Sequence, residues 1–172
     1  PNGAFAAQLL GGVNSDNNGL MGLEYQYNST LSGVKGRVIR NTDSQGNPLA
    51  TSSSKYYATK DGDSLVTSIV EVIQHYVEDA LAQGMKDTEA ESISCIVMNP
   101  RTGDILAMAS TPNYNPNDPY RPSSDDDYNS FKNLSTKEQS DYLSRMWTNS
   151  IVSGVYEPGS TFKLITASAA LD

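Results

Sequence analysis

Two strand-like runs of apolar residues lie in the middle of the chain, at residues 93–98 and 104–109. Between them stands Asn-Pro-Arg-Thr-Gly at residues 99–103, a turn-forming segment, so the pattern predicts a β-hairpin. The apolar character of both runs is nearly continuous, and we therefore expect a sheet that is covered, at least in part, on both faces. Helical periodicity elsewhere in the chain makes the predicted fold class α+β.

The longest predicted helix precedes this hairpin. Ser68-x-x-Glu71 has the spacing of a capping box, which predicts where the helix begins, and Gly84 is expected to end it. The segment is predicted to be amphipathic, with an apolar face that consists of Ile69, Val72, Ile73, Tyr76, Val77, Ala80 and Leu81.

Several shorter helices are predicted on either side. Residues 4–10 and 20–31 are helix candidates in the N-terminal third, and glycine follows each of them closely. A second capping box at residues 135–138 predicts a helix that extends to about Trp147. Residues 162–171 form a sustained apolar run that predicts a final helix.

A second hairpin and a domain boundary are predicted in the N-terminal part. Residues 34–40 and 49–59 predict two paired strands around a polar turn. The turn Lys-Asp-Gly-Asp that follows is the best candidate for a boundary between domains. It divides the chain into residues 1–62 and residues 63–172.

Composition and charge argue against several classes of function for this chain. The 172 residues carry a net charge of −8 with a pI near 4.5, which argues against a nucleic-acid partner. No apolar stretch approaches the length of about 20 residues that a membrane span needs. Because Cys95 and His75 are the single cysteine and histidine, neither a metal site nor a Ser-His-Asp hydrolase is expected. The acidic run at residues 125–127 is interpreted as part of a solvated loop over 111–127.

Candidate nucleophilic chemistry rests on a serine and a lysine three residues apart. A serine hydroxyl attacks a carbonyl well only if a neighbouring group takes its proton, and a lysine at i+3 lies on the same helix face. This S-x-x-K spacing occurs three times, at Ser32/Lys35, Ser52/Lys55 and Ser160/Lys163. Only Ser160 follows a Pro-Gly break and opens a sustained helix, so it is the favoured nucleophile. An ordinary helix N-cap is the alternative interpretation of Ser160 taken alone.

Residues 156–163 read Tyr-Glu-Pro-Gly-Ser-Thr-Phe-Lys, and Trp147-x-Asn149 stands shortly before them. Residues 96–112 run from Ile-Val-Met-Asn-Pro through Arg-Thr-Gly-Asp to Ser-Thr-Pro, and residues 22–33 contain Gly-Leu-Glu and end in Leu-Ser-Gly. With these segments in this order, the chain resembles a class B penicillin-binding protein, the monofunctional D,D-transpeptidase type. Residues 156–163 resemble the family's active-site segment, and residues 96–112 resemble the first hairpin of its transpeptidase domain. Residues 22–33 resemble its pedestal, or dimerisation, domain.

The resemblance implies an N-terminal pedestal subdomain followed by the first part of a β-lactamase-like serine transpeptidase domain. The family's later motifs, S-x-N and K-T-G, do not follow Lys163 in this chain, so we expect a fragment that is inactive alone. Ser68-Ile69-Val70 stands where the family often has Thr-Ile-Asp, and the capping box is expected to replace the missing aspartate. Ser150 stands where the family usually has arginine.

By the same resemblance, Ser160 is the nucleophile and Lys163 the general base of a peptidoglycan D,D-transpeptidase. Ser160 is expected to attack the carbonyl between the last two D-alanines of a stem peptide, and β-lactams are expected to trap it as an ester. The resemblance implies no cofactor. It places the whole protein in the bacterial cell membrane, with its catalytic domain on the extracytoplasmic side among other cell-wall synthesis proteins.

Two alternatives stay open. Ser-Thr-Phe-Lys at residues 160–163 is also a class D β-lactamase spelling, although the Glu-Pro-Gly approach favours the transpeptidase. The other alternative is a non-catalytic scaffold module of the cell-wall synthesis machinery. Rapid hydrolysis of nitrocefin favours the first alternative, and a dispensable Ser160 favours the second.

Overall fold

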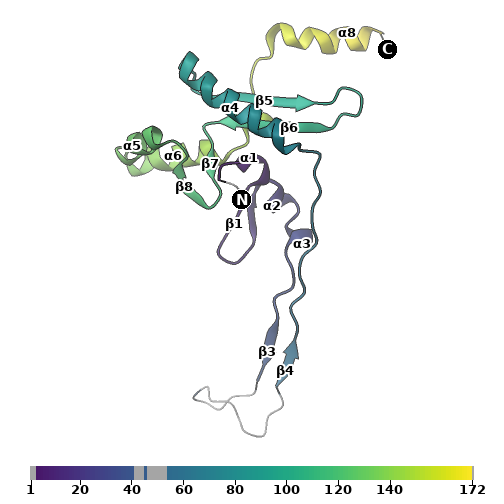
Figure 1. Ribbon diagram of the computed structural model, residues 1–172, viewed down its shortest axis with the longest axis vertical. Helices are drawn as coiled ribbons and strands as arrows, with labels where there is room; N and C mark the ends of the chain where they lie inside the picture. Colours follow the sequence, from purple (N-terminus) through teal and green to yellow (C-terminus); the bar gives the residue numbers. More distant parts are fainter. Residues whose placement is uncertain (1–2, 41–44, 46–53, 172) are drawn as a thin grey trace.

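The computed structural model describes residues 3–40, 45 and 54–171. It consists of a compact head, a long two-stranded arm (residues 34–40 and 54–60) and a separate C-terminal helix (Figure 1). Most of the predicted turn at 41–48 and the start of the predicted strand 49–59 lie outside the described residues. The elements are, in chain order, α1 (Ala7–Leu10), β1 (Gly12–Val13), β2 (Gly19–Met21), α2 (Gly22–Gln26), α3 (Asn28–Leu31), β3 (Arg37–Ile39), β4 (Lys55–Tyr57), α4 (Glu71–Thr88), β5 (Ile93–Met98), β6 (Ile105–Thr111), β7 (Tyr114–Asn115), β8 (Asp118–Pro122), α5 (Asp125–Lys132), α6 (Thr136–Trp147), α7 (Ser150–Ser153), η1 (Gly159–Phe162) and α8 (Lys163–Leu171).

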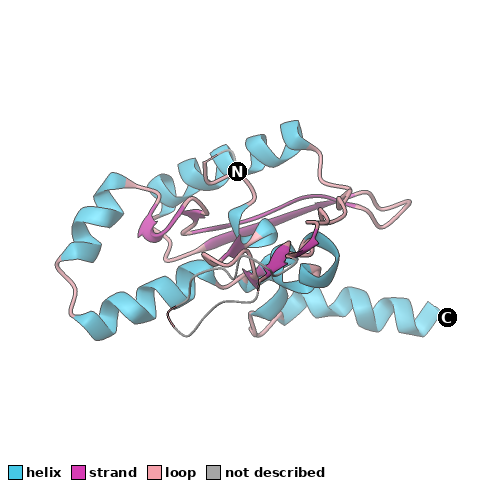
Figure 2. Cartoon of the chain, turned by 90° about the horizontal axis from the view of Figure 1, so that it is seen from below, coloured by secondary structure: helices cyan, strands magenta, loops and turns pink. Residues whose placement is uncertain are grey.

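The predicted central hairpin is confirmed, since β5 and β6 pair antiparallel along their lengths. Helices lie on both sides of these strands (Figure 2). On one face α4 packs so closely that a Cβ on Gly84 would lie 3.1 Å from the Ile93 side chain. On the other face α7 contacts the strands, and the Ser94 and Ser150 hydroxyls are 3.1 Å apart. Ile96 on this second face is still 47% exposed, so both faces are covered, but the second only in part.

The start and the end of α4 differ from the prediction. The helix begins at Glu71, and its N-cap position is Val70, which provides no side-chain cap. The predicted capping box is wrong, because the Ser68 hydroxyl donates instead to the Ile105 carbonyl at 2.7 Å. Ser68 therefore does not replace the aspartate that the family often has here. The helix also continues through the glycine that was expected to end it and stops at Thr88.

The face that α4 buries is also partly different from the predicted one. Val72 and Tyr76 belong to the predicted apolar face but are 62% and 73% exposed. Gln74 lies outside that face and is fully buried. Its amide oxygen accepts from the Met108 backbone N–H at 2.8 Å, and its amide nitrogen donates to the Met108 carbonyl at 3.0 Å. The side chain satisfies backbone groups of β6 that an apolar residue would leave without partners.

The N-terminal helix α1 packs into the head. Ala7 is buried with Tyr114 and Met146 in one apolar cluster. Beside it, the Gln8 side chain donates to the carbonyls of Pro112 and Met146 at 2.9 and 3.0 Å. The first of these bonds joins residues 104 positions apart, so the N-terminal segment completes the core of the later part of the chain.

The helix predicted over residues 20–31 is interrupted. Gly22 has a φ of +63°, and a Cβ there would lie 2.6 Å from the Gly11 backbone nitrogen. Two chain segments cross closely at this point, so β2 passes into α2 through a conformation that favours glycine. Two short helices, α2 and α3, then follow on either side of Tyr27.

The segment predicted as a loop over residues 111–127 is solvated at its end but contains regular structure. Strands β7 and β8 pair antiparallel, and α5 begins at Asp125. The Ser124 hydroxyl caps this helix by accepting from the Asp127 N–H. The acidic residues of the run occupy the first helical turn, where the helix dipole favours negative charge. Asp125 also pairs with Arg121 at 2.6 Å.

The second predicted capping box is confirmed at the start of α6. The Ser135 hydroxyl accepts from the Glu138 N–H, and the Glu138 carboxylate accepts from the Ser135 N–H at 2.9 Å. Hydrogen bonds from the Ser135 hydroxyl and then from its backbone N–H lower the pKa of Glu138. The helix ends at Trp147, as predicted.

We expect Tyr114 to make the stability of the head sensitive to alkaline pH. Burial raises the pKa of the Tyr114 phenol from about 10 to about 12, and its hydroxyl donates to the Ala7 carbonyl at 3.2 Å. Above pH 10 this phenol ionises in the unfolded chain but keeps its proton in the folded one. Stability is therefore fully present below about pH 10 and is lost as the pH rises towards 12. We expect a loss of about 2 kcal/mol after allowing for solvent screening.

Urea unfolding between pH 9 and pH 12 measures this effect when the wild type is compared with Tyr114→Phe, which has no phenol to ionise at this position. The variant is expected to start less stable but to lose less stability over the same range. Tyr76→Phe is the matched control, because Tyr76 is 73% exposed. An alkaline loss of the same size in Tyr114→Phe as in wild type would contradict the prediction.

Candidate active site

Ser160 and Lys163 lie in one continuous helical run near the C-terminal end of the chain. Ser160 belongs to the 3₁₀ turn η1, and Lys163 is the first residue of α8. Gly159, with a φ of +55°, leads the chain into this run. The predicted final helix is confirmed, but it is preceded by a 3₁₀ turn that the apolar pattern did not indicate. Side chains three residues apart in such a turn lie on the same side.

The Ser160 hydroxyl does not cap the helix. Pro158 occupies the N-cap position of η1 without a side-chain hydrogen bond, and the Thr161 hydroxyl donates to the Pro158 carbonyl. Within the described part of the chain, the Ser160 hydroxyl has no hydrogen-bond partner. The interpretation of Ser160 as an ordinary N-cap is therefore wrong.

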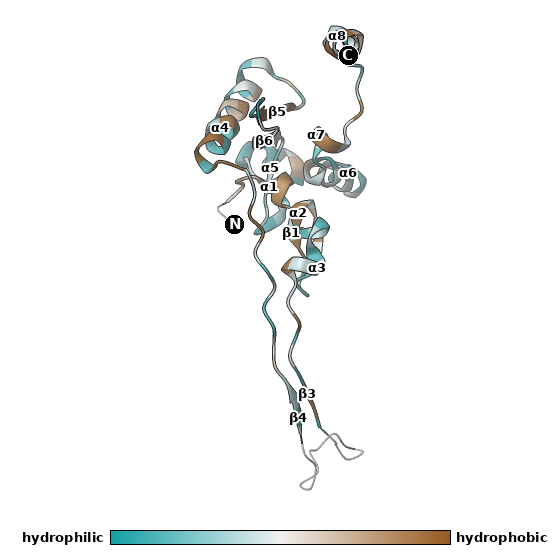
Figure 3. Cartoon of the chain, turned by 90° about the vertical axis from the view of Figure 1, so that its right-hand side faces the viewer, coloured by the Kyte–Doolittle hydropathy of each residue, from teal (hydrophilic) through white to brown (hydrophobic). Residues whose placement is uncertain are grey.

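The segment that carries both residues is exposed throughout. All residues from 154 to 171 are exposed, and α8 projects away from the head (Figures 1 and 3). Apolar side chains share this exposure, with Phe162 at 52%, Leu164 at 74% and Ile165 at 61%. An isolated helix of this length is marginal in water, because most helical stability comes from packing. Among the described residues, only the helical run itself therefore lies next to Ser160.

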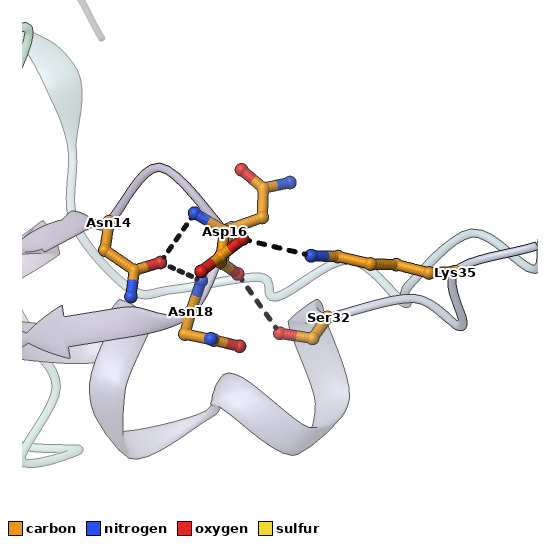
Figure 4. A network of polar contacts seen from close by, with 6 residues as sticks. Asn14, Asp16, Asn18, Ser32 and Lys35 are labelled. Atoms are coloured by element: carbon orange, nitrogen blue, oxygen red, sulfur yellow. Dashed lines mark hydrogen bonds and ion pairs between the residues drawn. The ribbon is translucent and has the colours of Figure 1, made fainter. Parts of the chain in front are cut away.

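The other two S-x-x-K pairs have different surroundings. The Ser32 hydroxyl donates to the Asn28 side chain at 2.8 Å, at the end of α3. The Lys35 ammonium lies 3.7 Å from the Asp16 carboxylate, in the polar turn that Figure 4 shows. Both residues stabilise this turn, which accounts for the pair without catalysis. Ser52 of the third pair lies outside the described residues.

Trp147 and Asn149 fix the end of α6 and the start of α7, ahead of the segment that leads to Ser160. The Trp147 indole N–H donates to the Pro119 carbonyl at 2.6 Å, and its ring meets Tyr120 edge-on with the centroids 5.4 Å apart. The Asn149 side chain caps α7 by accepting from the Ile151 N–H at 3.1 Å. These contacts hold α6 and α7 in place, whereas residues 154–158, between α7 and Ser160, are exposed.

Two open cavities lie beside this approach and away from Ser160. One has a volume of about 430 Å³, and its lining includes Gln8, Ser110 and Arg145. The other, of about 710 Å³, is lined by residues that include Gln8 and Trp147. Gln8 thus lines both cavities, although the hydrophobic pattern of the sequence did not indicate that it is a core residue. The available signal was a polar residue within an otherwise apolar run, Ala-Ala-Gln-Leu-Leu.

The described residues contain no group of three or more His, Cys, Asp or Glu side chains that could hold a metal ion. His75 is exposed, and its ring packs against the Phe5 ring with the centroids 4.7 Å apart. None of the helices in the described ranges is long and apolar enough to cross a bilayer.

Two family models match successive regions of the chain. The model for the penicillin-binding protein dimerisation domain matches residues 1–67. The model for the penicillin-binding protein transpeptidase domain matches residues 93–172, and this region contains Ser160 and Lys163. The candidate nucleophile and base therefore lie within the transpeptidase match.

Curated relatives match over nearly the whole chain. Stage V sporulation protein D of Bacillus subtilis is 34% identical over 172 residues, which are 100% of this chain and 24% of that protein. Peptidoglycan D,D-transpeptidase FtsI of Buchnera aphidicola is 34% identical over 171 residues, 99% of this chain and 26% of that protein. The chain thus spans about a quarter of the length of these relatives.

Solved structures with the same fold include penicillin-binding protein 3 from Mycobacterium tuberculosis. It is 27% identical with a TM-score of 0.67, and the match covers 99% of this chain and 30% of that one. Penicillin-binding protein 2X from Streptococcus thermophilus is 32% identical with a TM-score of 0.55, over 67% of this chain and 18% of that one. The expected α+β fold, a pedestal subdomain followed by the start of a transpeptidase domain, is confirmed.

Proposed function

The chain belongs to the penicillin-binding proteins, and from this premise we propose that the whole protein is a peptidoglycan D,D-transpeptidase. One observation carries the proposal: Ser160 and Lys163 lie three residues apart in one helical run, inside the region that the transpeptidase family matches. A domain boundary after residue 62 belongs to the same proposal. It rests on the turn at residues 60–63, at the base of the arm.

In the proposed reaction, the Ser160 hydroxyl oxygen attacks the carbonyl carbon between the last two D-alanines of a stem peptide. Lys163 takes the hydroxyl proton, the peptide bond breaks, and D-alanine leaves with a proton on its nitrogen. An acyl ester on Ser160 remains. The amine of a neighbouring stem peptide then attacks this ester, so that a new amide forms and the serine oxygen regains a proton.

The position of Ser160 in the first turn of a helical run supports its role. The first N–H groups of a helix have no acceptor within the helix, so they can donate to an oxyanion that forms beside them. We propose the Ser160 backbone N–H as one such donor. The remainder of the transpeptidase domain would supply the second donor and cover the exposed apolar residues Phe162, Leu164 and Ile165.

Ligands and location follow from the same proposal. Solved structures of Mycobacterium tuberculosis penicillin-binding protein 3 include complexes with aztreonam and with ampicillin. We propose that β-lactams likewise acylate Ser160 in the whole protein, because their carbonyl mimics that of the stem peptide. We place the protein at the bacterial cell membrane, with this domain on the extracytoplasmic side and with other cell-wall synthesis proteins as partners.

A fluorescent penicillin and nitrocefin together test the proposal on the full-length protein. We expect one stable covalent adduct per molecule on a denaturing gel and no rapid colour change of nitrocefin. Rapid nitrocefin turnover would indicate a class D-like β-lactamase instead. The absence of any adduct would contradict both the transpeptidase and the β-lactamase assignments. The 172-residue chain alone is expected to form no adduct, because Ser160 is exposed and, among the residues that the structure describes, only the helical run lies beside it.

A further inference from the structure

The dipeptide Asn18-Gly19 lies where the polar turn of Figure 4 passes into β2. Asn-Gly is especially prone to deamidation, because glycine has no side chain to hinder the attack of its nitrogen on the preceding amide. The dipeptide occurs twice in the chain, at residues 2–3 and 18–19. Deamidation is therefore possible at Asn18, and the surroundings of the dipeptide decide how fast it proceeds.

Deamidation requires the Gly19 backbone nitrogen to reach the Asn18 side chain. The nitrogen bonds to Cγ, the bond between Cγ and Nδ2 breaks, and ammonia leaves with the Gly19 proton. Water then opens the resulting succinimide ring at one of its two carbonyls, which leaves aspartate or isoaspartate. The peptide group between the two residues is planar, so it must rotate as a unit before the ring can close. Contacts that hold this plane therefore slow the reaction.

Both ends of this peptide plane are held by hydrogen bonds. Its carbonyl, which belongs to Asn18, accepts from the Asn14 backbone N–H at 2.9 Å. Its N–H, which belongs to Gly19, donates to the Asn28 side-chain oxygen at 2.8 Å. The Asn14 side chain also accepts from the Asn18 N–H at 2.9 Å, so the preceding peptide group is held as well. Rotation of the plane must break these bonds.

The reacting side chain and the glycine are not protected in the same way. Asn18 is exposed, and its side chain has no hydrogen-bond partner among the residues that the structure describes. Gly19 cannot be exchanged for a larger residue, because a Cβ there would lie 2.0 Å from the Glu24 carbonyl oxygen. The close approach of β2 to α2 thus requires the glycine that makes Asn18 reactive, and the restraint lies in the backbone.

We propose that Asn18 is a deamidation site and that Asn28 protects it. The Asn28 oxygen holds the proton on the Gly19 nitrogen and fixes the peptide plane, so the reaction proceeds only through local opening of the turn. Its product adds a negative charge near Asp16, which pairs with Lys35 at 3.7 Å. The inference does not depend on the proposed enzymatic activity, because all these residues lie outside the helical run of Ser160.

Mass spectrometry of the full-length protein, incubated in mildly alkaline buffer, tests the proposal. Chymotrypsin cleaves after Phe5 and so places Asn2 and Asn18 in separate peptides. Asn28→Ala removes the acceptor of the Gly19 N–H. We expect Asn18 to deamidate about fivefold faster in this variant, as for the loss of one hydrogen bond that opposes opening. The rate at Asn2 is expected to stay the same.

Two matched variants assign the effect to this one hydrogen bond. Asn28→Asp keeps an acceptor oxygen at the same position, so Asn18 should deamidate no faster than in wild type. Ser32→Ala removes the other donor to the Asn28 side chain, at 2.8 Å, and is expected to stay within about twofold of wild type. In concentrated urea, all variants should deamidate at the same rate at Asn18, because the unfolded chain has no such bond.

Three results would overturn the proposal. The first is an equal rate at Asn18 in folded wild type and folded Asn28→Ala. The second is a slower rate in Asn28→Ala, which would make the Asn28 oxygen a base that assists the reaction. The third needs no variant and decides the matter if Asn28→Ala does not fold: wild type that deamidates at Asn18 as fast in native buffer as in urea has no protection there.

Discussion

Replacing Ser160 with alanine in the full-length protein is expected to abolish its covalent labelling by a fluorescent penicillin. In the proposed reaction the serine oxygen forms the ester bond, and alanine offers no atom that can form it. Loss of a serine nucleophile typically lowers turnover by about 10⁴-fold to 10⁶-fold. We therefore expect no labelled band on a denaturing gel at any penicillin concentration that saturates the wild type.

Lys163→Gln tests the proposed base separately from the proposed nucleophile Ser160. The glutamine keeps a polar side chain of similar length but cannot take the Ser160 proton, so the rate of acylation should fall about 10²-fold or more while a slow adduct still forms. Ser32→Ala is the matched control for the serine, because it removes the hydroxyl of another S-x-x-K pair that serves a turn. This control should label like wild type.

Full labelling of Ser160→Ala would contradict the assignment of the nucleophile. If cell-wall function also survived in that variant, the non-catalytic scaffold interpretation would gain over the enzyme. Labelling that is lost equally in Ser32→Ala would point to a folding defect rather than to chemistry, and the unfolding profile of each variant distinguishes these cases.

The second large effect is expected from Gln8, which joins the N-terminal segment to the rest of the head. Its side chain is 8% exposed, donates to the carbonyls of Pro112 and Met146, and accepts from the Ser110 hydroxyl at 2.5 Å. Gln8→Ala leaves these three groups without that partner inside the core. Buried polar groups without a partner cost about 1–3 kcal/mol each, so we expect a total loss of about 3 kcal/mol.

Urea unfolding of wild type and variants measures this loss as a lower transition midpoint. Gln83→Ala is the matched control, because Gln83 makes an exposed hydrogen bond to Asp87 on the surface of α4. Substitutions at such exposed positions usually change stability by less than about 0.5 kcal/mol. If Gln8→Ala and Gln83→Ala lose the same small amount, the buried network does not hold α1 in the head.

The elements that sequence predicted correctly are those whose signals are local. The β5–β6 hairpin surrounds a five-residue turn segment, and α6 begins with a capping box between Ser135 and Glu138, so each is specified within a few positions. The same spacing at Ser68 and Glu71 does not form a capping box, because the Ser68 hydroxyl donates instead to the Ile105 carbonyl of β6. A serine hydroxyl can either cap a nearby helix or bond to a distant backbone group. Before α4, Ser68 bonds to the distant carbonyl.

In the candidate site, too, the sequence indicated the local features and missed the long-range contacts. The spacing of Ser160 and Lys163 and the Pro-Gly break before them are local, and they singled out one of three S-x-x-K pairs. The structure then showed that Ser32 and Lys35 stabilise a turn. The supporting hydrogen bond from Trp147 to Pro119 spans 28 positions, and no periodicity along the chain could indicate it.

The sequence by itself determined the central hairpin, the start of α6 and the family, and it singled out Ser160 and Lys163 as the candidate pair, because these depend on residue identity over short spacings. Only the tertiary structure decided that Gln8 and Gln74 are core residues and that α4 turns Val72 and Tyr76 to solvent. The physical reason is that buried backbone groups of β6 and its neighbours need partners, and those partners come from segments far away in the chain. A hydrophobic pattern records which residues avoid water, but it does not record which distant carbonyl or N–H a buried amide must satisfy.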